Sequence, residues 1–246
     1  MNKTHNRDKS VIITGATKGL GKALSLAFAK AGYEVIGVYR SDTLSAKTLE
    51  SEFQASGLQG VFIKQDITQN GTWAEFDEII TNNPNKHFTL IANACLPFIP
   101  KPIHLIDWLE ISALVDVNVK GTFLIFKRLL PLMVKARSGT VISVLTTALN
   151  PPPKGFAAYI IAKSAMEGLT KAVAAEYAAR GIRVFSVSPG FMETSLTSGW
   201  SEHLKALTVS RDGSIQQPAE LAERILGLTE NSGTVGEGEN YLLDSI

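Results

Sequence analysis

Short apolar runs alternate with longer amphipathic segments along most of this 246-residue chain. Consecutive β-branched residues are typical of strands covered on both faces, and apolar positions at helical spacing indicate helices. The expected strands are Val11–Thr14, Glu34–Tyr39, Gly60–Gln65, Phe88–Ala92, Thr140–Leu145, Arg183–Val187 and Tyr241–Leu243. The expected helices are Leu20–Ala31, Leu44–Ser56, Trp73–Asn82, Ile106–Lys135, Phe156–Arg180 and Ala219–Thr229. This order predicts an α/β fold, a doubly wound parallel sheet of about seven strands with helices on both faces.

Two segments interrupt the alternation. Asn150–Gly155 contains three consecutive prolines, and Phe191–Gly213 is rich in Ser and Thr and only weakly periodic. Both follow strands, and ligands of open α/β sheets bind beyond the carboxyl ends of the strands. We therefore expect both segments to wall a substrate pocket, with 191–213 as a mobile loop. The alternative is that both are ordinary surface loops.

Composition narrows the class of protein. Twenty-four Lys and Arg against 23 Asp and Glu leave a net charge of +1, so no nucleic-acid partner is expected. Cys95 is the only cysteine, which excludes an intrachain disulfide and fits a reducing cytoplasm. The four histidines lack ligand spacing, so no metal is expected. Without an export signal or membrane span, we expect a cytoplasmic protein with one domain over 1–246, opening with a polar tail at 1–9.

A glycine-rich turn follows the first expected strand. Its sequence is Gly15-Ala16-Thr17-Lys18-Gly19-Leu20-Gly21, and a helix follows it. Glycines let the backbone approach a pyrophosphate, whose charge is met by free N–H groups and the helix dipole. The strand before the turn and the helix after it favour a dinucleotide site over an ordinary turn.

The turn and Tyr159-Ile160-Ile161-Ala162-Lys163 together resemble the short-chain dehydrogenase/reductase family over essentially the whole chain. Within that family, the chain is most similar to the 3-oxoacyl-[acyl-carrier-protein] reductases. The segments that carry this closer likeness are Val35-Ile36-Gly37, Gly181–Val184 and Pro189–Thr194. The resemblance implies a single-domain Rossmann-like fold.

Charge at the end of the second strand favours NADP(H) as the cofactor. NAD users commonly place an acid there, whereas a cation accommodates a 2′-phosphate. Here Tyr39 ends the strand, Arg40 follows, and Lys18 lies in the glycine-rich turn. The alternative is that both cations are solvated surface charges, and Asp42 is near enough in sequence to compete for Arg40.

The resemblance implies further cofactor contacts after the third, fourth and sixth strands. The expected cofactor-binding set is Gly15, Thr17, Lys18, Gly19, Leu20, Gly21, Arg40, Ser41, Asp66, Ile67, Asn93, Ala94, Tyr159, Lys163, Pro189, Gly190, Met192 and Thr194. The chain departs from the family at Ala92 and Cys95, where asparagine and glycine are usual. We expect Cys95 to be a small buried residue rather than a reactive thiol.

Tyr159 and Lys163 are four residues apart, which puts both on one face of a helix. A neighbouring ammonium, together with an oxidised nicotinamide, favours the phenolate and lowers the pKa of tyrosine, so Tyr159 can act as acid or base. Thr146 lies thirteen residues earlier, where the family has a serine, and keeps a hydroxyl for the substrate carbonyl. Asn118 matches the asparagine that holds a water in the family's proton relay.

The resemblance implies that the protein reduces a ketone to a secondary alcohol with NADPH. The reductases that it resembles most act on a 3-oxoacyl thioester carried on acyl carrier protein. Arg137 and Arg180 resemble docking residues for that carrier, although each could instead complement a helix C-terminus. We expect a homotetramer or homodimer formed through the helices 106–135 and 156–180. The substrate can alternatively be another small ketone. A non-catalytic NADP(H)-binding subunit is the rival class, favoured by the departures at Ala92, Cys95 and Thr146.

Overall fold

The computed structural model describes residues 9–82, 87–212, 214–231 and 236–243. Residues 1–8 of the expected tail at 1–9 lie outside the described residues, and Lys9 belongs to the first strand instead. Within these ranges the strands are β1 (Lys9–Thr14), β2 (Glu34–Tyr39), β3 (Gly60–Lys64), β4 (His87–Ala92), β5 (Gly139–Val144), β6 (Ile182–Ser188) and β7 (Asn240–Leu242). They form one parallel sheet in the order β3-β2-β1-β4-β5-β6-β7. The predicted strands are confirmed to within one residue at most ends, and β1 begins two residues earlier.

The helices alternate with the strands as predicted. Those described are α1 (Gly19–Lys30), α2 (Thr43–Ala55), α3 (Ala74–Thr81), α4 (Trp108–Val115), α5 (Thr122–Ala136), α6 (Ala157–Tyr177), α7 (Glu202–Asp212) and α8 (Pro218–Glu230). Gly32, Gly57 and Gly181 follow helices with positive φ angles of 91°, 65° and 81°, where a side chain would be strained. None of the described helices is long and apolar enough to cross a membrane.

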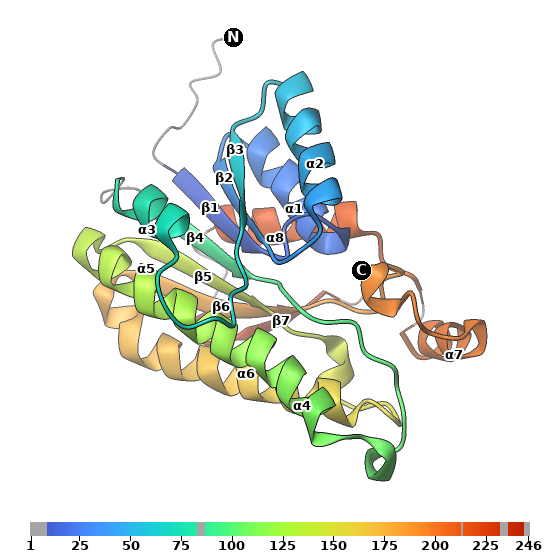
Figure 1. The fold of residues 1–246 in the computed structure, drawn as a ribbon. Helices are drawn as coiled ribbons and strands as arrows, with labels where there is room; N and C mark the ends of the chain where they lie inside the picture. Colours follow the sequence, from blue (N-terminus) through green and yellow to red (C-terminus); the bar gives the residue numbers. More distant parts are fainter. Residues whose placement is uncertain (1–8, 83–86, 213, 232–235, 244–246) are drawn as a thin grey trace.

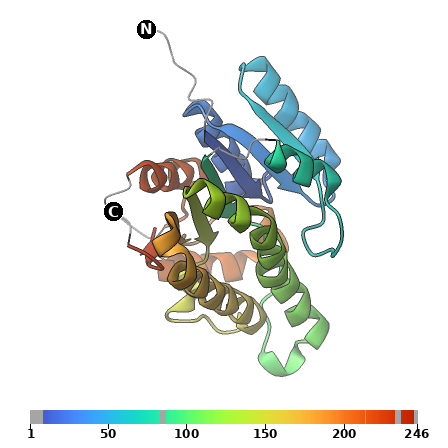
Figure 2. The same cartoon turned by 90° about the vertical axis from the view of Figure 1, so that its left-hand side faces the viewer.

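Helices cover both faces of the sheet (Figures 1 and 2). On one face, Phe28 of α1, Leu49 of α2 and Ile225 of α8 pack in one apolar cluster with the sheet. On the other face, residues of α3, α5 and α6 pack in a second cluster. Strands buried on both sides explain why their sequences are continuously apolar rather than alternating.

Two expected segments differ in detail from the structure. The predicted helix 106–135 is observed as one helical run over 108–136, but a π-helical turn, η2 (Asp116–Gly121), joins α4 to α5 within it. The segment 191–213 is not a plain loop, because it contains a short 3-10 turn, η5 (Ser195–Thr197), and α7. Its weak periodicity hid the helix: α7 places few apolar residues on any one face.

The sheet order changes direction between β1 and β4. Their chain connections leave toward opposite halves of the sheet, so the carboxyl ends of these two strands border a crevice. Both segments expected to wall a pocket, 150–155 and 191–213, begin beyond the carboxyl ends of β5 and β6, but only 191–213 contributes lining residues and the expectation for 150–155 was wrong. The fold therefore brings the candidate residues of sequence-distant strands to one edge.

Candidate active site

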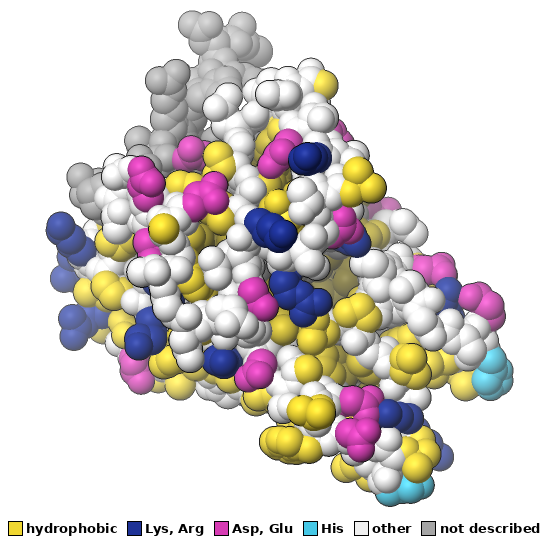
Figure 3. Space-filling view, in the orientation of Figure 1, with side chains coloured by type: hydrophobic (Ala, Val, Ile, Leu, Met, Phe, Trp, Pro, Cys, Tyr) yellow, Lys and Arg dark blue, Asp and Glu magenta, His cyan; other side chains and the backbone are white. Residues whose placement is uncertain are grey.

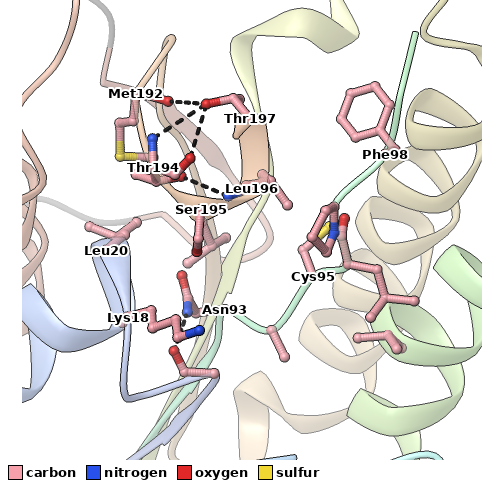
Figure 4. A pocket seen from close by; sticks show the side chains of 18 of the residues that line it. Lys18, Leu20, Asn93, Cys95, Phe98, Met192, Thr194, Ser195, Leu196 and Thr197 are labelled. Carbon is pink, nitrogen blue, oxygen red and sulfur yellow. Dashed lines mark hydrogen bonds between the residues drawn. The ribbon is translucent and has the colours of Figure 1, made fainter. Parts of the chain in front are cut away.

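A cavity of about 540 Å³ opens at the carboxyl ends of the strands. In the space-filling view, hydrophobic side chains floor the hollow between the regions of α4 and α7 (Figure 3). Figure 4 shows the segment Thr194–Thr197 on one side of the opening, Phe98 and Cys95 on another, and Lys18 and Asn93 together on the side of the glycine-rich turn. The cavity is continuous from the glycine-rich turn to Tyr159.

All residues of the expected cofactor-binding set line this one cavity. They are Gly15, Thr17, Lys18, Gly19, Leu20, Gly21, Arg40, Ser41, Asp66, Ile67, Asn93, Ala94, Tyr159, Lys163, Pro189, Gly190, Met192 and Thr194. The set comes from the segments that follow β1, β2, β3, β4 and β6 and from α6, so the agreement does not follow from sequence proximity. Of the four expected catalytic residues, Thr146, Tyr159 and Lys163 also line the cavity.

The glycine-rich turn has room for backbone only. Gly15 and Gly19 have positive φ angles of 66° and 48°, and a Cβ on Gly21 would lie 2.0 Å from the Gly15 carbonyl oxygen. The first turn of α1 carries no acidic side chain, so its free N–H groups face no local negative charge. The turn is thus shaped for close approach by an anionic group.

Asn93 supports the turn from the neighbouring strand. Its Nδ2 donates to the carbonyl oxygen of Thr14 at 2.9 Å, and its backbone N–H donates to Oγ1 of Thr14 at 3.0 Å. Ala94 N–H donates to the same hydroxyl at 2.9 Å. Asn93 therefore bridges β1 and β4 at the crevice. Ala92, which replaces the family's asparagine, has no side-chain amide and cannot support the turn in this way.

Lys18 in the glycine-rich turn and Arg40 beyond β2 have different partners. Lys18 forms an ion pair with Asp42, and its charge and hydrogen bond lower the pKa of Asp42 to about 2. The expectation that Asp42 competes for Arg40 was therefore wrong. Burial alone would raise the pKa of Asp66, but hydrogen bonds from Thr68 and the charge of Arg40 hold that pKa below its usual value. Arg40 and Asp66 thus lie close enough to interact.

Tyr159 and Lys163 are buried on one face of α6, with 8% and 2% of their surfaces exposed. The Lys163 Nζ lies 5.8 Å from the centre of the Tyr159 ring and donates to the Val144 carbonyl oxygen at 2.7 Å. Thr146 follows β5, its Oγ1 accepts from Ala148 N–H at 3.2 Å, and its side chain is also hydrogen-bonded to Tyr159. These three side chains converge as the sequence predicted.

Burial shifts the two ionisable groups in opposite directions. Burial raises the pKa of the Tyr159 phenol, negative charge on Cys95 would raise it further, and the Thr146 hydrogen bond opposes the rise. Burial lowers the pKa of the Lys163 ammonium. The expectation of a lowered tyrosine pKa is therefore not met by the protein groups alone, because desolvation outweighs the hydrogen bond from Thr146.

Asn118 lies in the π-helical turn η2 and is fully buried. Its Nδ2 donates to the Leu114 carbonyl oxygen at 2.9 Å and contacts the Cys95 sulfur at 3.6 Å. Its Oδ1 has no hydrogen-bond partner within the described part of the chain. A buried carbonyl left in this way needs a partner, and a bound water would satisfy it.

Cys95 is only half-buried and lines the cavity, so the expectation of a buried packing residue was wrong. Four aromatic residues, Phe98, Phe156, Phe191 and Trp200, line the cavity around Tyr159; Phe191 and Trp200 lie in the segment 191–213 that was expected to do so, whereas Phe98 and Phe156 were not predicted. Phe98 follows β4, and Phe191 and Trp200 follow β6. Their places beyond strand ends were the available signal.

Arg137 and Arg180 are both exposed. Their backbones are close together, since Gly181, the residue after Arg180, lies so near Arg137 that a Cβ on it would be 2.5 Å from the Arg137 carbonyl oxygen. They precede β5 and β6, whereas the cavity opens where these strands end. Within one chain they therefore lie at the end of the sheet opposite the cavity, so these candidate docking residues do not flank the entrance of their own pocket.

Comparison with known families decides the class of this site. The model of the short chain dehydrogenase family matches residues 9–205, which include the glycine-rich turn, Asn118, Thr146, Tyr159 and Lys163. The chain belongs to this family. It is therefore an oxidoreductase, and Tyr159 and Lys163 both lie within the matched region.

Relatives within the short-chain dehydrogenase family cover nearly the whole chain. The 3-oxoacyl-[acyl-carrier-protein] reductase of Synechocystis is 31% identical over 95% of this chain and 94% of its own. The reductase of that name from Thermotoga maritima is 31% identical over 96% of each chain. The solved 3-ketoacyl-(acyl-carrier-protein) reductase of Brucella melitensis, complexed with NADH, superposes with a TM-score of 0.86 at 25% identity, covering 97% of each chain.

The family fold also carries other activities. A structure described as a gluconate 5-dehydrogenase from Beutenbergia cavernae superposes with a TM-score of 0.87 at 22% identity, covering 97% of this chain and 96% of that one. This likeness shows the fold alone, since one fold hosts many reactions.

Proposed function

We propose that this chain is an NADP(H)-dependent ketoreductase that reduces a 3-oxoacyl thioester to the 3-hydroxyacyl thioester. The observation that carries the proposal is one cavity with Lys18 and Arg40 at one end and Tyr159, Lys163 and Thr146 at the other. The cationic end suits a phosphate-bearing cofactor, and the other end suits proton transfer to a carbonyl oxygen.

The residues present fit a dinucleotide. The Gly15–Gly21 turn lines the cavity and admits no side chain at Gly21, where a Cβ would clash with the Gly15 carbonyl, and Arg40 and Ser41 lie beyond β2 on the same cavity. Asp66 and Ile67 would hold the adenine, Asn93 and Ala94 the second ribose, and Met192 and Thr194 the carboxamide. When bound, the reduced nicotinamide supplies the hydride for the ketone carbon.

The protein groups supply the proton and stabilise the oxygen. Tyr159 donates its phenolic proton to the oxygen as the alcohol forms, and the Thr146 hydroxyl donates a hydrogen bond to the same oxygen. Lys163 stabilises the resulting phenolate through its positive charge. The unpartnered Oδ1 of Asn118 would hold a water from which the proton is replaced.

An acyl substrate is favoured over a polyol by the cavity wall near Tyr159. Leu96, Phe98, Leu196 and Trp200 make much of this lining apolar, beside the hydroxyls of Ser195, Ser198 and Thr208, and the Trp200 Nε1 already donates to the Phe98 carbonyl oxygen. Burying unpaired hydroxyls against such a wall is costly. The relatives named as 3-oxoacyl-carrier reductases agree with this preference.

Acyl carrier protein is the expected donor of the thioester, and Arg137 with Arg180 its candidate docking pair. Because both arginines lie at the sheet edge opposite their own cavity, they could serve only the entrance of a neighbouring copy. The proposal therefore joins carrier docking to the expected homodimer or homotetramer. In such an oligomer, the basic pair of one copy would have to lie beside the pocket of the other copy.

Two measurements test the proposal. NADPH oxidation, followed at the nicotinamide absorbance, is expected with a 3-oxoacyl thioester and not with a polyol-derived ketone. Tyr159→Phe keeps the ring and its packing but removes the proton donor, so turnover should fall by roughly 10²- to 10⁴-fold. Tight NADPH binding without turnover by the wild type would favour the non-catalytic subunit.

A further inference from the structure

The ketone end of the cavity is walled by four aromatic residues, Phe98, Phe156, Phe191 and Trp200, here called the aromatic wall. They come from three separate parts of the chain, after β4, before α6 and after β6. Phe156, Phe191 and Trp200 pack with Tyr159 in one buried cluster, against which Phe98 packs while still partly exposed. Phe98 is therefore the ring of this wall that a bound substrate can reach.

Phe98 is held in a fixed orientation. Its ring lies nearly parallel to that of Tyr159, with centroids 4.6 Å apart and 8° between the planes. Phe156 and Trp200 meet it edge-on at 5.2 Å and 5.4 Å. In addition, Trp200 Nε1 donates to the Phe98 carbonyl oxygen at 2.8 Å, which ties the segment after β4 to the segment after β6.

The opposite side of the opening is also apolar. Figure 4 shows Leu196 on the side of the Thr194–Thr197 segment and Phe98 across the opening from it. The segment is fixed by its own hydrogen bonds, in which Thr194 Oγ1 accepts from Leu196 N–H at 3.3 Å and Thr197 Oγ1 donates to the Thr194 carbonyl oxygen at 3.2 Å. Leu196 and Phe98 thus bound the ketone end with two positioned apolar groups.

We propose that the ketone end selects substrates whose carbonyl carbon bears a planar aromatic group, with Phe98 as the specificity-determining residue. Aromatic rings gain from stacked or edge-to-face contact beyond the burial of apolar area, and the wall already arranges its own rings in both ways. A flexible alkyl chain of equal carbon number lacks that gain and loses more rotational freedom on binding. This inference rests on the proposed ketoreductase function and names its substrate class.

The substrates for the test differ only in the group beyond the ketone. They are the N-acetylcysteamine thioesters of 3-oxo-3-phenylpropanoic, 3-cyclohexyl-3-oxopropanoic and 3-oxononanoic acids, which place a phenyl, cyclohexyl or hexyl group at the same position. A phenyl ketone is intrinsically less electrophilic, so the quantity compared is the phenyl-to-hexyl ratio of kcat/KM in wild type divided by that ratio in Phe98→Leu. The intrinsic difference cancels in this comparison.

We expect Phe98→Leu to lower the phenyl-to-hexyl ratio by about two- to twelvefold, the range of one aromatic pair. The cyclohexyl-to-hexyl ratio should change little, because that ring is not planar. Phe98→Tyr, which keeps an aromatic ring at this position, should retain the phenyl-to-hexyl ratio of the wild type. Phe123→Leu is the matched control, since Phe123 lies on α5 and does not line the cavity.

The same phenyl-to-hexyl ratio in wild type and Phe98→Leu would overturn the inference while leaving the ketoreductase function standing. Equal loss of activity on all three thioesters with NADPH binding retained would also overturn it, by assigning Phe98 to the support of Tyr159 alone. Failure of the wild type to reduce any of the three would instead overturn the proposed function, on which the inference depends. NADPH binding, measured by fluorescence, checks that each variant is folded.

Discussion

The Asn118 side-chain nitrogen lies 3.6 Å from the Cys95 sulfur, and this contact joins the π-helical turn η2 to the wall of the cavity. The sulfur also donates weakly to the Leu96 carbonyl oxygen at 3.5 Å. Cys95 thus contacts the buried Asn118 and also lines the substrate cavity. Because Cys95 is partly exposed and lines the cavity, we expect a small reagent in the cavity to reach its thiol.

Alkylation of Cys95 is therefore expected to abolish turnover. An N-ethylmaleimide adduct on this sulfur would fill the space beside Tyr159 and displace the Asn118 contact. Cys95→Ala should stay active and become resistant to the reagent. Since the chain has one cysteine, intact-protein mass can be compared directly with residual activity. One adduct per chain with full activity retained would show that the thiol does not face the substrate space.

The alkaline limit of ketone reduction should depend on Tyr159. Burial raises the pKa of its phenol, and the protonated phenol is the form that can donate. The kcat/KM for ketone reduction with saturating NADPH should therefore be nearly constant from about pH 6 to pH 9, and fall only at higher pH as the phenol ionises. The reverse reaction needs the phenolate, so its rate should increase with pH.

Thr146→Val tests the origin of that limit. The hydrogen bond from Thr146 opposes the rise in the Tyr159 pKa, so its removal should move the alkaline fall to still higher pH while lowering the rate on the plateau. Thr146→Ser, which keeps the hydroxyl, is the matched control and should preserve the profile. A fall at unchanged pH in the valine variant would separate Thr146 from the titration of Tyr159.

The parts of the site that sequence predicted are those with local rules. The turn Gly15–Gly21 must follow a strand and precede a helix, and Tyr159 with Lys163 share a helix face because 3.6 residues make one turn. Parallel strands then bring Asp66, Asn93 and Pro189 to one edge, since all their strands end there. Strand order and chain position were enough for these residues.

The parts that were missed depend on contacts between distant segments. The Trp200 to Phe98 hydrogen bond joins residues 102 positions apart, and neither side chain belongs to a periodic pattern. The π-helical turn at Asn118 adds one residue to a helical turn without any proline or glycine break before it. Asp42 pairs with Lys18 and not with Arg40 because of the path that the chain takes after β2. Counting the charges in the sequence does not specify that path.

The expected homodimer or homotetramer is predicted to form through exposed apolar side chains of α4. Trp108 and Leu109, which are adjacent on that helix, are 72% and 78% exposed. Exposed apolar surface of this kind is typical of an interface with another molecule. Trp108→Lys with Leu109→Lys should therefore lower the solution mass, measured by light scattering, to that of one chain. Leu44→Lys on α2, also highly exposed, is the control and should leave the mass unchanged.

Asp42 should limit the affinity for NADPH by holding Lys18. With a pKa of about 2, its carboxylate is charged at any working pH and neutralises a cation that the 2′-phosphate would otherwise use. Asp42 also caps α2, accepting from Ser45 N–H at 2.9 Å, so Asp42→Asn removes the charge while keeping an efficient cap. The KM for NADPH should fall by about two- to fivefold, as expected for release of an exposed ion pair, and the KM for NADH should not change. Lys22→Gln, which breaks the comparable ion pair with Glu52, is the control for general charge effects. An equal change in both KM values for Asp42→Asn would mean that Lys18 does not meet the 2′-phosphate.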